Sequence, residues 1–214
     1  LKAFYKACAT VVKEERNYTL RCSLLTELMQ LPNTAWLSII NQDQSTNTEE
    51  NYKALTSLLD INIAVCEATG RHFIVQLEPM YAGILQLYKS VSDIILQQMN
   101  GDNITTSDTT IIRICRNVKR RILNLFKTFV MDLNATDFDR YYDPMLKSFM
   151  DIALLDYRQE LPAFKDPELL ICMNEVVIKS GQRNSQSISS IIENTFLPTL
   201  NMLSTDTSDY PDHR

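Results

Sequence analysis

The sequence predicts an all-α protein. Apolar residues recur three and four positions apart along nearly all of the 214-residue chain, and no stretch shows the sustained alternation typical of strands. Only 4 glycines are present, so tight turns and phosphate-binding loops have few places to form. With 45% hydrophobic and 22% charged residues, the composition is that of a globular protein with a substantial core.

The helix starts are predicted from the apolar period and from capping residues. Asp166, Pro167 and Glu168 combine an N-cap acceptor, a proline at the first helical position and an acid at the positive end of the dipole. The stretch from Thr136 to Asp139 resembles a capping box. We expect helices at 1–14, 18–30, 34–42, 48–69, 71–99, 108–132, 136–160, 167–180 and 185–204.

Glycines and polar tracts predict where these helices end. Gly70, Gly101 and Gly181 each follow a long periodic stretch, at the position where the chain turns left-handed without a Cβ penalty. The polar tract at 41–51 is interpreted as a loop between helices rather than a domain boundary, because the helical period resumes on both sides. We therefore expect residues 1–214 to form one block without an internal boundary.

Prolines give the helices a second regularity. Pro79, Pro144 and Pro198 each lie in a long helical stretch and precede a bulky apolar run, whereas 108–132 has no proline and 167–180 has one only at its first position. An internal proline bends its helix, which is tolerated on an outer helix that wraps its neighbours. The alternation predicts about four antiparallel helix pairs of the HEAT type, stacked as an α-solenoid.

Composition also limits the classes of function. The formal net charge of -5 argues against a domain devoted to nucleic acid or anionic membrane, and no apolar run approaches the ~20 residues that span a bilayer. We interpret the chain as soluble, intracellular and, since it begins at Leu1 inside an amphipathic pattern, as a piece of a longer protein. Glycosylation-type triplets at Asn17, Asn103 and Asn134 are interpreted as chance matches.

Catalytic and metal sites are not expected. The cysteines stand singly in apolar stretches without a CxxC pair, and only two histidines, His72 and His213, are available to help them. We interpret the thiols as small buried hydrophobic groups in a reducing compartment. Phosphate loops, nucleophile elbows and zinc signatures are missing from the sequence, so we expect no enzyme activity and no cofactor. The cysteines are Cys8, Cys22, Cys66, Cys115 and Cys172.

A cationic cluster, "RICRNVKRR" at 113–121, stands out in this acidic chain. At ~100° per residue, Arg116, Arg120 and Lys127 fall within about 60° of Arg113 on a helical wheel, opposite a wholly apolar face. A solvated helix face explains such a cluster about as well as a binding site does. Because a proline-free helix of a solenoid can line its concave surface, we predict that the cluster binds an acidic protein surface. The predicted partner-binding residues are Arg113, Arg116, Lys119, Arg120 and Lys127.

Several segments together resemble one family, the exportin-1 family of karyopherin-β nuclear export receptors. The matching segments run in the family's order and cover nearly the whole chain. They are "LPNTAWLSII" (31–40), "VCEATGRHFIVQL" (65–77), "YAGILQLYKSVS" (81–92), "RNVKRRILNL" (116–125), "LLDYRQELPAFKDPELLICMNEVVIKSG" (154–181) and "TLNMLSTDTSDYPDHR" (199–214). The loops at 41–51 and 100–110 match no family segment, and 182–196 is only loosely similar.

The resemblance implies a block of HEAT repeats from the C-terminal half of a receptor that shuttles between nucleus and cytoplasm through the nuclear pore. Such receptors carry proteins with leucine-rich export signals together with Ran-GTP, and they contact nucleoporins. In that family the signal cleft and its reactive cysteine precede the matched region. The resemblance therefore implies that this chain supplies curvature and part of the inner surface around Ran, without a role for its own cysteines.

Two other functions remain open. A helical nucleic-acid-binding module could use Arg113, Arg116, Arg120 and Lys127, although such modules usually add exposed aromatic residues or glycine-rich loops. A purely structural segment would make no direct contacts, and reversing these charges would then leave partner assembly unchanged.

Overall fold

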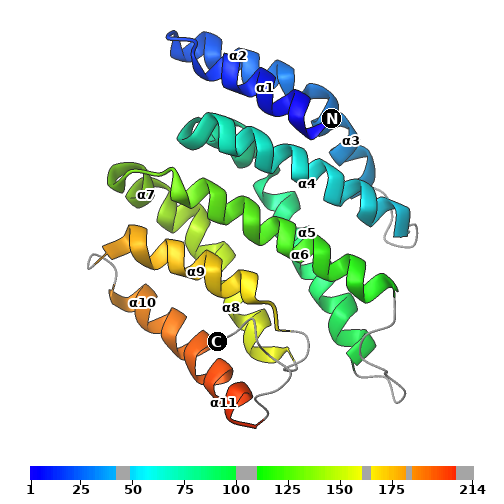
Figure 1. The fold of residues 1–214 in the computed structure, drawn as a ribbon, viewed down its shortest axis with the longest axis vertical. Coiled ribbons are helices and arrows are strands. Elements are labelled where there is room, and N and C mark those ends of the chain that lie inside the picture. The colour runs from blue at the N-terminus through cyan, green and yellow to red at the C-terminus, as the bar shows by residue number, and fades with distance from the viewer. Residues whose placement is uncertain (42–48, 100–109, 161–164, 182–184, 206–214) are drawn as a thin grey trace. The chain divides into compact units, whose positions relative to one another are not determined.

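The computed structural model describes residues 1–41, 49–99, 110–160, 165–181 and 185–205, and within these ranges it contains helices and no strands. The predicted all-α class is confirmed. The chain divides into two compact units, residues 1–132 and 133–214 (Figure 1). Each unit is built from stacked helices of the HEAT-type α-solenoid, and the expectation of a single uninterrupted block stays a prediction.

Unit 1 contains six α-helices in its described residues, and a 3-10 turn joins two of them. Its elements are α1 (Lys2–Lys13), α2 (Tyr18–Leu28), α3 (Gln30–Ile40), α4 (Glu49–Thr69), η2 (Gly70–Phe73), α5 (Ile74–Met99) and α6 (Thr110–Met131).

Two layers make up unit 1. One layer places α4 between α1 and α6, and Figure 1 shows these three helices side by side. Most of α4 is buried as a result, from Tyr52 to Thr69. The other layer holds α2, α3 and α5, with α5 packed on α6 and α2. The proline-bearing α3 and α5 therefore share a layer, and the proline-free α4 and α6 share the opposite one.

In its described residues, unit 2 has two interrupted helices, and a third helix lies against the first. Its elements are α7 (Ala135–Tyr141), η3 (Tyr142–Leu146), α8 (Lys147–Gln159), α9 (Pro167–Ser180), α10 (Ser185–Ile191), η6 (Ile192–Phe196) and α11 (Leu197–Thr205). Both interruptions, η3 and η6, are π-helical turns. They lie at Pro144 and just before Pro198, where the missing N–H prevents a regular α-helical turn. In unit 1, α5 instead continues through Pro79.

Two predicted helix starts differ from the structure in position or in cap, and a third is confirmed. The expected start at residue 34 is wrong, because α3 begins at Gln30 and tolerates Pro32 in its first turn. Asn134, not Thr136, caps α7, since its Oδ1 accepts from Asp137 N at 2.8 Å. The start of α9 is confirmed with its proline at the first position, although the side chain of Asp166 makes no cap hydrogen bond.

Glycines end two helices as predicted. Gly70 follows α4 with φ 60°, and Gly181 follows α9 with φ 54°. The third predicted stop, Gly101, lies outside the described residues. A side chain at Gly70 would be strained in this left-handed conformation and would also meet the Asp132 carboxylate at 3.2 Å.

The thiols behave largely as the sequence predicts. Cys66, Cys115 and Cys172 are buried, and Cys8 and Cys22 are half-buried. Burial raises the pKa of the Cys66 thiol well above its usual value, which keeps the thiol protonated and unreactive at neutral pH. Among the described helices, none has both the length and the apolar character needed to cross a membrane.

Candidate partner-binding surface

Helix α6 is amphipathic because its sequence separates apolar and charged positions. Most of its apolar residues, from Ile112 to Val130, are buried against α4 and α5, whereas Met131 at its end is exposed. On the opposite side Arg113 is exposed, and Arg116, Arg120 and Lys127 are partly exposed. These four cations, which we call the α6 basic row, share one side of the helix as predicted from the wheel. Their binding of a partner stays a prediction.

Lys119 does not belong to this row. Its side chain is only 3% exposed, and its Nζ lies 5.3 Å from the centroid of the Tyr88 ring on α5. On the wheel Lys119 falls about 240° from Arg113, beside the apolar face, so its aliphatic stem packs in the core and its charge meets an aromatic face. A partner docking on the exposed side of α6 would not reach this ammonium in this structure.

Arg121 is a cation that the wheel argument did not single out. It lies on the flank of α6 that faces α4, where its Nε approaches Asp60 Oδ1 at 3.1 Å. On the other flank of α4, Lys6 Nζ of α1 binds Glu67 Oε2 at 2.7 Å. These ion pairs connect the three helices of one layer across its solvent-facing side. Sequence alone could not reveal them, because the partners are 61 residues apart in each case.

The electrostatic consequence is an uneven surface. Acidic and basic groups pair where α4 meets α1 and α6. Arg113 and Lys127 make no ion pair with any residue that the structure describes, whereas Arg116 and Arg120 take part in further interactions. Exposed cations of this layer lie along α6 and also on α1, at Lys2 and Lys13, and such positive charge favours an acidic partner.

Two observations on the described residues concern metal binding and the reactivity of thiols. No group of three or more His, Cys, Asp or Glu side chains there could hold a metal ion. Burial raises the pKa of Cys115 to about 11, so this thiol of α6 is a poor nucleophile near pH 7.

A family model described as "CRM1 C terminal" matches residues 76–214. The chain belongs to this family. Curated relatives named exportin-1 match almost the whole chain: it is 30% identical to exportin-1 of the fission yeast Schizosaccharomyces pombe and 29% identical to that of Drosophila melanogaster, each over 99% of its length. Exportin-1 of Dictyostelium discoideum is 27% identical over the full length. The resemblance noted in the sequence is thus confirmed.

The chain spans about a fifth of the length of these relatives, 20% in each case. The family match covers α6, all of unit 2 and most of α5, and the relatives extend the similarity through α1 to α4. The α6 basic row therefore lies inside the region that defines the family.

Proposed function

We propose that this chain is a segment of a nuclear export receptor and that the α6 basic row contributes to holding an acidic partner surface. Membership of the CRM1 C-terminal family and relatives named exportin-1 support the first part. The observation that carries the second part is the row itself, which combines exposed Arg113 and partly exposed Lys127 with a buried apolar face that fixes the helix in place. The segment acts as a binding scaffold and not as an enzyme.

The partner that best fits this role is Ran in its GTP form, with export-signal cargo bound to a cleft outside this chain. The layer of α1, α4 and α6 would belong to the receptor's inner surface, and the layer of α2, α3 and α5 to its outer surface. In the complete receptor this segment would supply curvature, contacts to nucleoporins would accompany transport through the pore, and the protein would shuttle between nucleus and cytoplasm.

Charge reversal in the complete receptor tests the proposal. The variant Arg113→Glu, Arg120→Glu, Lys127→Glu should weaken assembly with Ran-GTP and cargo by about tenfold or more, because like charges face each other across the contact. Pull-down and titration with purified Ran-GTP measure this. The matched control reverses three exposed cations away from α6, at Lys89, Lys147 and Arg158.

The two outcomes separate the competing functions. Unchanged assembly in the α6 variant would contradict the proposal and favour a purely structural segment. Retention of bulk RNA that falls steeply with salt and disappears in the α6 variant would favour a nucleic-acid-binding module. The structure gives no particular support to that module, since both aromatic residues of α6, Phe126 and Phe129, are fully buried.

A further inference from the structure

A network of buried carboxamides joins three helices of unit 1. Gln76 of α5 is 2% exposed and Asn62 of α4 is 1% exposed. Gln76 Nε2 donates to Asn62 Oδ1 at 3.1 Å and to Asn33 Oδ1 of α3 at 2.6 Å, while Asn33 Nδ2 donates back to Gln76 Oε1 at 3.1 Å. The amide of Asn33 is thereby fixed from its buried side. An amide carries two N–H donors and two lone pairs on its oxygen, so Asn33 retains hydrogen-bonding capacity on its other side.

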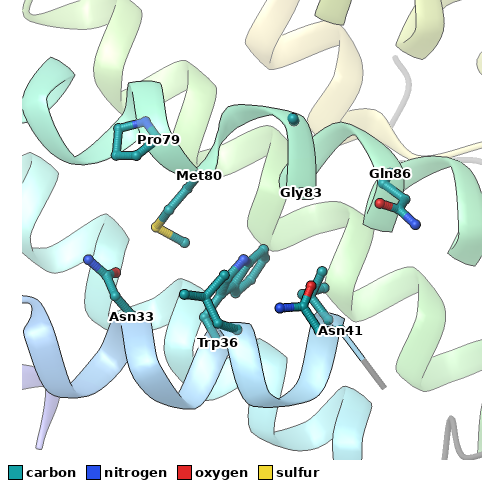
Figure 2. A pocket seen from close by; sticks show the side chains of 10 residues that line it. Asn33, Trp36, Asn41, Pro79, Met80, Gly83 and Gln86 are labelled. Atoms are coloured by element: carbon teal, nitrogen blue, oxygen red, sulfur yellow. The ribbon is translucent and has the colours of Figure 1, made fainter. Parts of the chain in front are cut away.

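Beside this network, a cavity of about 300 Å³ lies between α3 and α5. Figure 2 shows the side chains of both helices that surround it. The lining residues are Asn33, Trp36, Leu37, Ile40, Asn41, Pro79, Met80, Ala82, Gly83 and Gln86.

Gly83 and Trp36 set the floor of the cavity. The indole of Trp36 is buried at 2% exposure, and a Cβ at position 83 would lie 3.3 Å from its Nε1. Glycine therefore lets α5 approach the indole edge while adding no side chain of its own. Ala82 of α5 also lines the cavity, and its small side chain leaves space beside Trp36 and Gly83. The space is a consequence of two small residues opposite a large aromatic one.

The chemistry of the lining is uncharged throughout. Its middle is largely apolar, with Trp36, Met80 and Gly83, and its polar side-chain groups are carboxamides and the indole N–H of Trp36. In Figure 2 the Asn33 amide lies towards Met80 at one end, and Asn41 and Gln86 lie towards the other end. Because no ionisable side chain is present to compensate a charge, a charged ligand would lose hydration without gaining a counter-ion.

We propose that this cavity binds a small uncharged molecule with an apolar body and a hydrogen-bonding group at each end. At ~30 Å³ per water, the volume corresponds to about ten waters, and thus to a ligand of about ten non-hydrogen atoms. This is the lower end of the usual range for small-molecule sites. The inference is independent of the proposed export function.

The only tryptophan of the chain makes the test direct, since the full chain gives one indole N–H signal in an NMR spectrum, that of Trp36. The probe is 4-acetamidophenol, an aromatic ring between an amide and a hydroxyl, which is neutral at pH 7 because phenols ionise near pH 10. Titration should shift the Trp36 signal saturably with a dissociation constant in about the millimolar range. In the analogue 4-acetamidobenzoate a carboxylate replaces the hydroxyl. Its affinity should be lower by about tenfold or more.

Two variants connect the signal to the cavity. Ala82→Glu places a carboxylate at an exposed position of the lining and should abolish the saturable shift. Ala54→Glu makes the same change at an exposed position of α4 and should leave binding unchanged. If circular dichroism shows that Ala82→Glu is unfolded, Ala82→Phe fills the same space without a charge and should weaken binding about tenfold or more.

Several results would overturn the proposal. They are a linear, unsaturable shift of the Trp36 signal, equal binding of the carboxylate analogue, and full binding by a folded Ala82 variant. A blocked peptide, acetyl-Ser-Ser-Phe-Ser-Ser-amide, provides one more arm. If it binds tenfold more tightly than 4-acetamidophenol, the natural occupant is a peptide of a partner protein and the small-molecule assignment is wrong.

Discussion

Two contacts within unit 1 place polar groups among apolar ones in different ways. Where α4 meets α6, two buried groups are titratable, Tyr52 of α4 and Cys115 of α6. Burial, and after it the charge of the nearby Cys115, raises the pKa of Tyr52. The same contact has an ion pair, Asp60–Arg121, at its solvent edge. Where α3 meets α5, the polar groups are the carboxamides of half-buried Asn33 and buried Gln76, which carry no charge at any pH.

This difference separates two kinds of sensitivity. A contact held around titratable groups and a surface ion pair responds to pH and to salt. A contact held by amide hydrogen bonds responds to neither, but it fails when one partner is removed, because the remaining amides are left buried and unsatisfied. The charged contact supports the surface proposed to hold a protein, and the neutral contact supports the cavity proposed to hold an uncharged ligand.

The largest effect is expected from breaking the carboxamide network. Gln76→Leu keeps the approximate volume but removes the partner of Asn33 and of Asn62, and unsatisfied buried groups cost about 1–3 kcal/mol each. The free energy of unfolding should fall by about 2–4 kcal/mol, as measured by urea denaturation. The loss should be equal at pH 7 and pH 9.

The matched control is Gln86→Leu, the same change at an exposed position of the same helix. Its effect should lie within about 0.5 kcal/mol of zero. If Gln76→Leu lowers the free energy of unfolding as little as the control does, the network contributes nothing to stability. The α3/α5 contact would then not differ from the α4/α6 contact in the way argued above.

A smaller effect is expected at alkaline pH in the α4/α6 contact. Burial raises the pKa of the Cys115 thiol from 9.0 to about 11, with the charge of Lys119 opposing the shift. The folded state thus keeps a proton that the unfolded chain releases. The stabilisation is complete below pH 9 and is lost as the pH rises to about 11, by about 2 kcal/mol at that pH.

Comparison of variants separates the contribution of the Cys115 thiol from that of other groups that titrate at alkaline pH, such as Tyr52. Between pH 9 and pH 11, Cys115→Ala should lose less stability than the wild type by that amount, and Cys22→Ala on α2 should follow the wild type. Parallel curves for all three proteins would show that the Cys115 proton is not coupled to folding.

Much of the helical framework could be predicted from the sequence, because it depends on local chemistry. The apolar period located every helix of the described residues, and Pro167 marked the start of α9. The errors also have local causes. Asn17 and Asn134 were interpreted as chance glycosylation triplets, but both cap helices, and an asparagine directly before an apolar period is itself a capping signal.

The sites were less predictable, because they depend on which helices meet. The α6 basic row depends on one helix alone and was predicted. The burial of Lys119 depends on Tyr88 of α5, a contact that the sequence does not show. The position of Lys119 beside the apolar face of the helical wheel already indicated that it does not belong to the row. The cavity required knowing that Gly83 lies against Trp36. Both residues fall in segments that resemble the exportin-1 family, at 31–40 and 81–92. Nothing in either segment alone indicates that a cavity lies between them.

The smallest effect is expected at the solvent edge of the α4/α6 contact. The side chains of Asp60 and Arg121 are 29% and 38% exposed, so their ion pair is worth about 0.2–1 kcal/mol. Asp60→Asn should lower the free energy of unfolding by that amount in 20 mM salt, measured by urea denaturation. In 1 M salt the Debye length is about 3 Å, and the difference from wild type should vanish.

The control is Asp93→Asn on α5, which makes the same change in net charge at an exposed position and should cost nothing at either salt concentration. Gln76→Leu should keep its full cost in 1 M salt, since its hydrogen bonds are buried and uncharged. A cost of Asp60→Asn that persists in 1 M salt would place a specific hydrogen bond, not charge attraction, at this edge. The α4/α6 contact would then resemble the amide contact, and its sensitivity to conditions would reduce to the titration of its buried thiol.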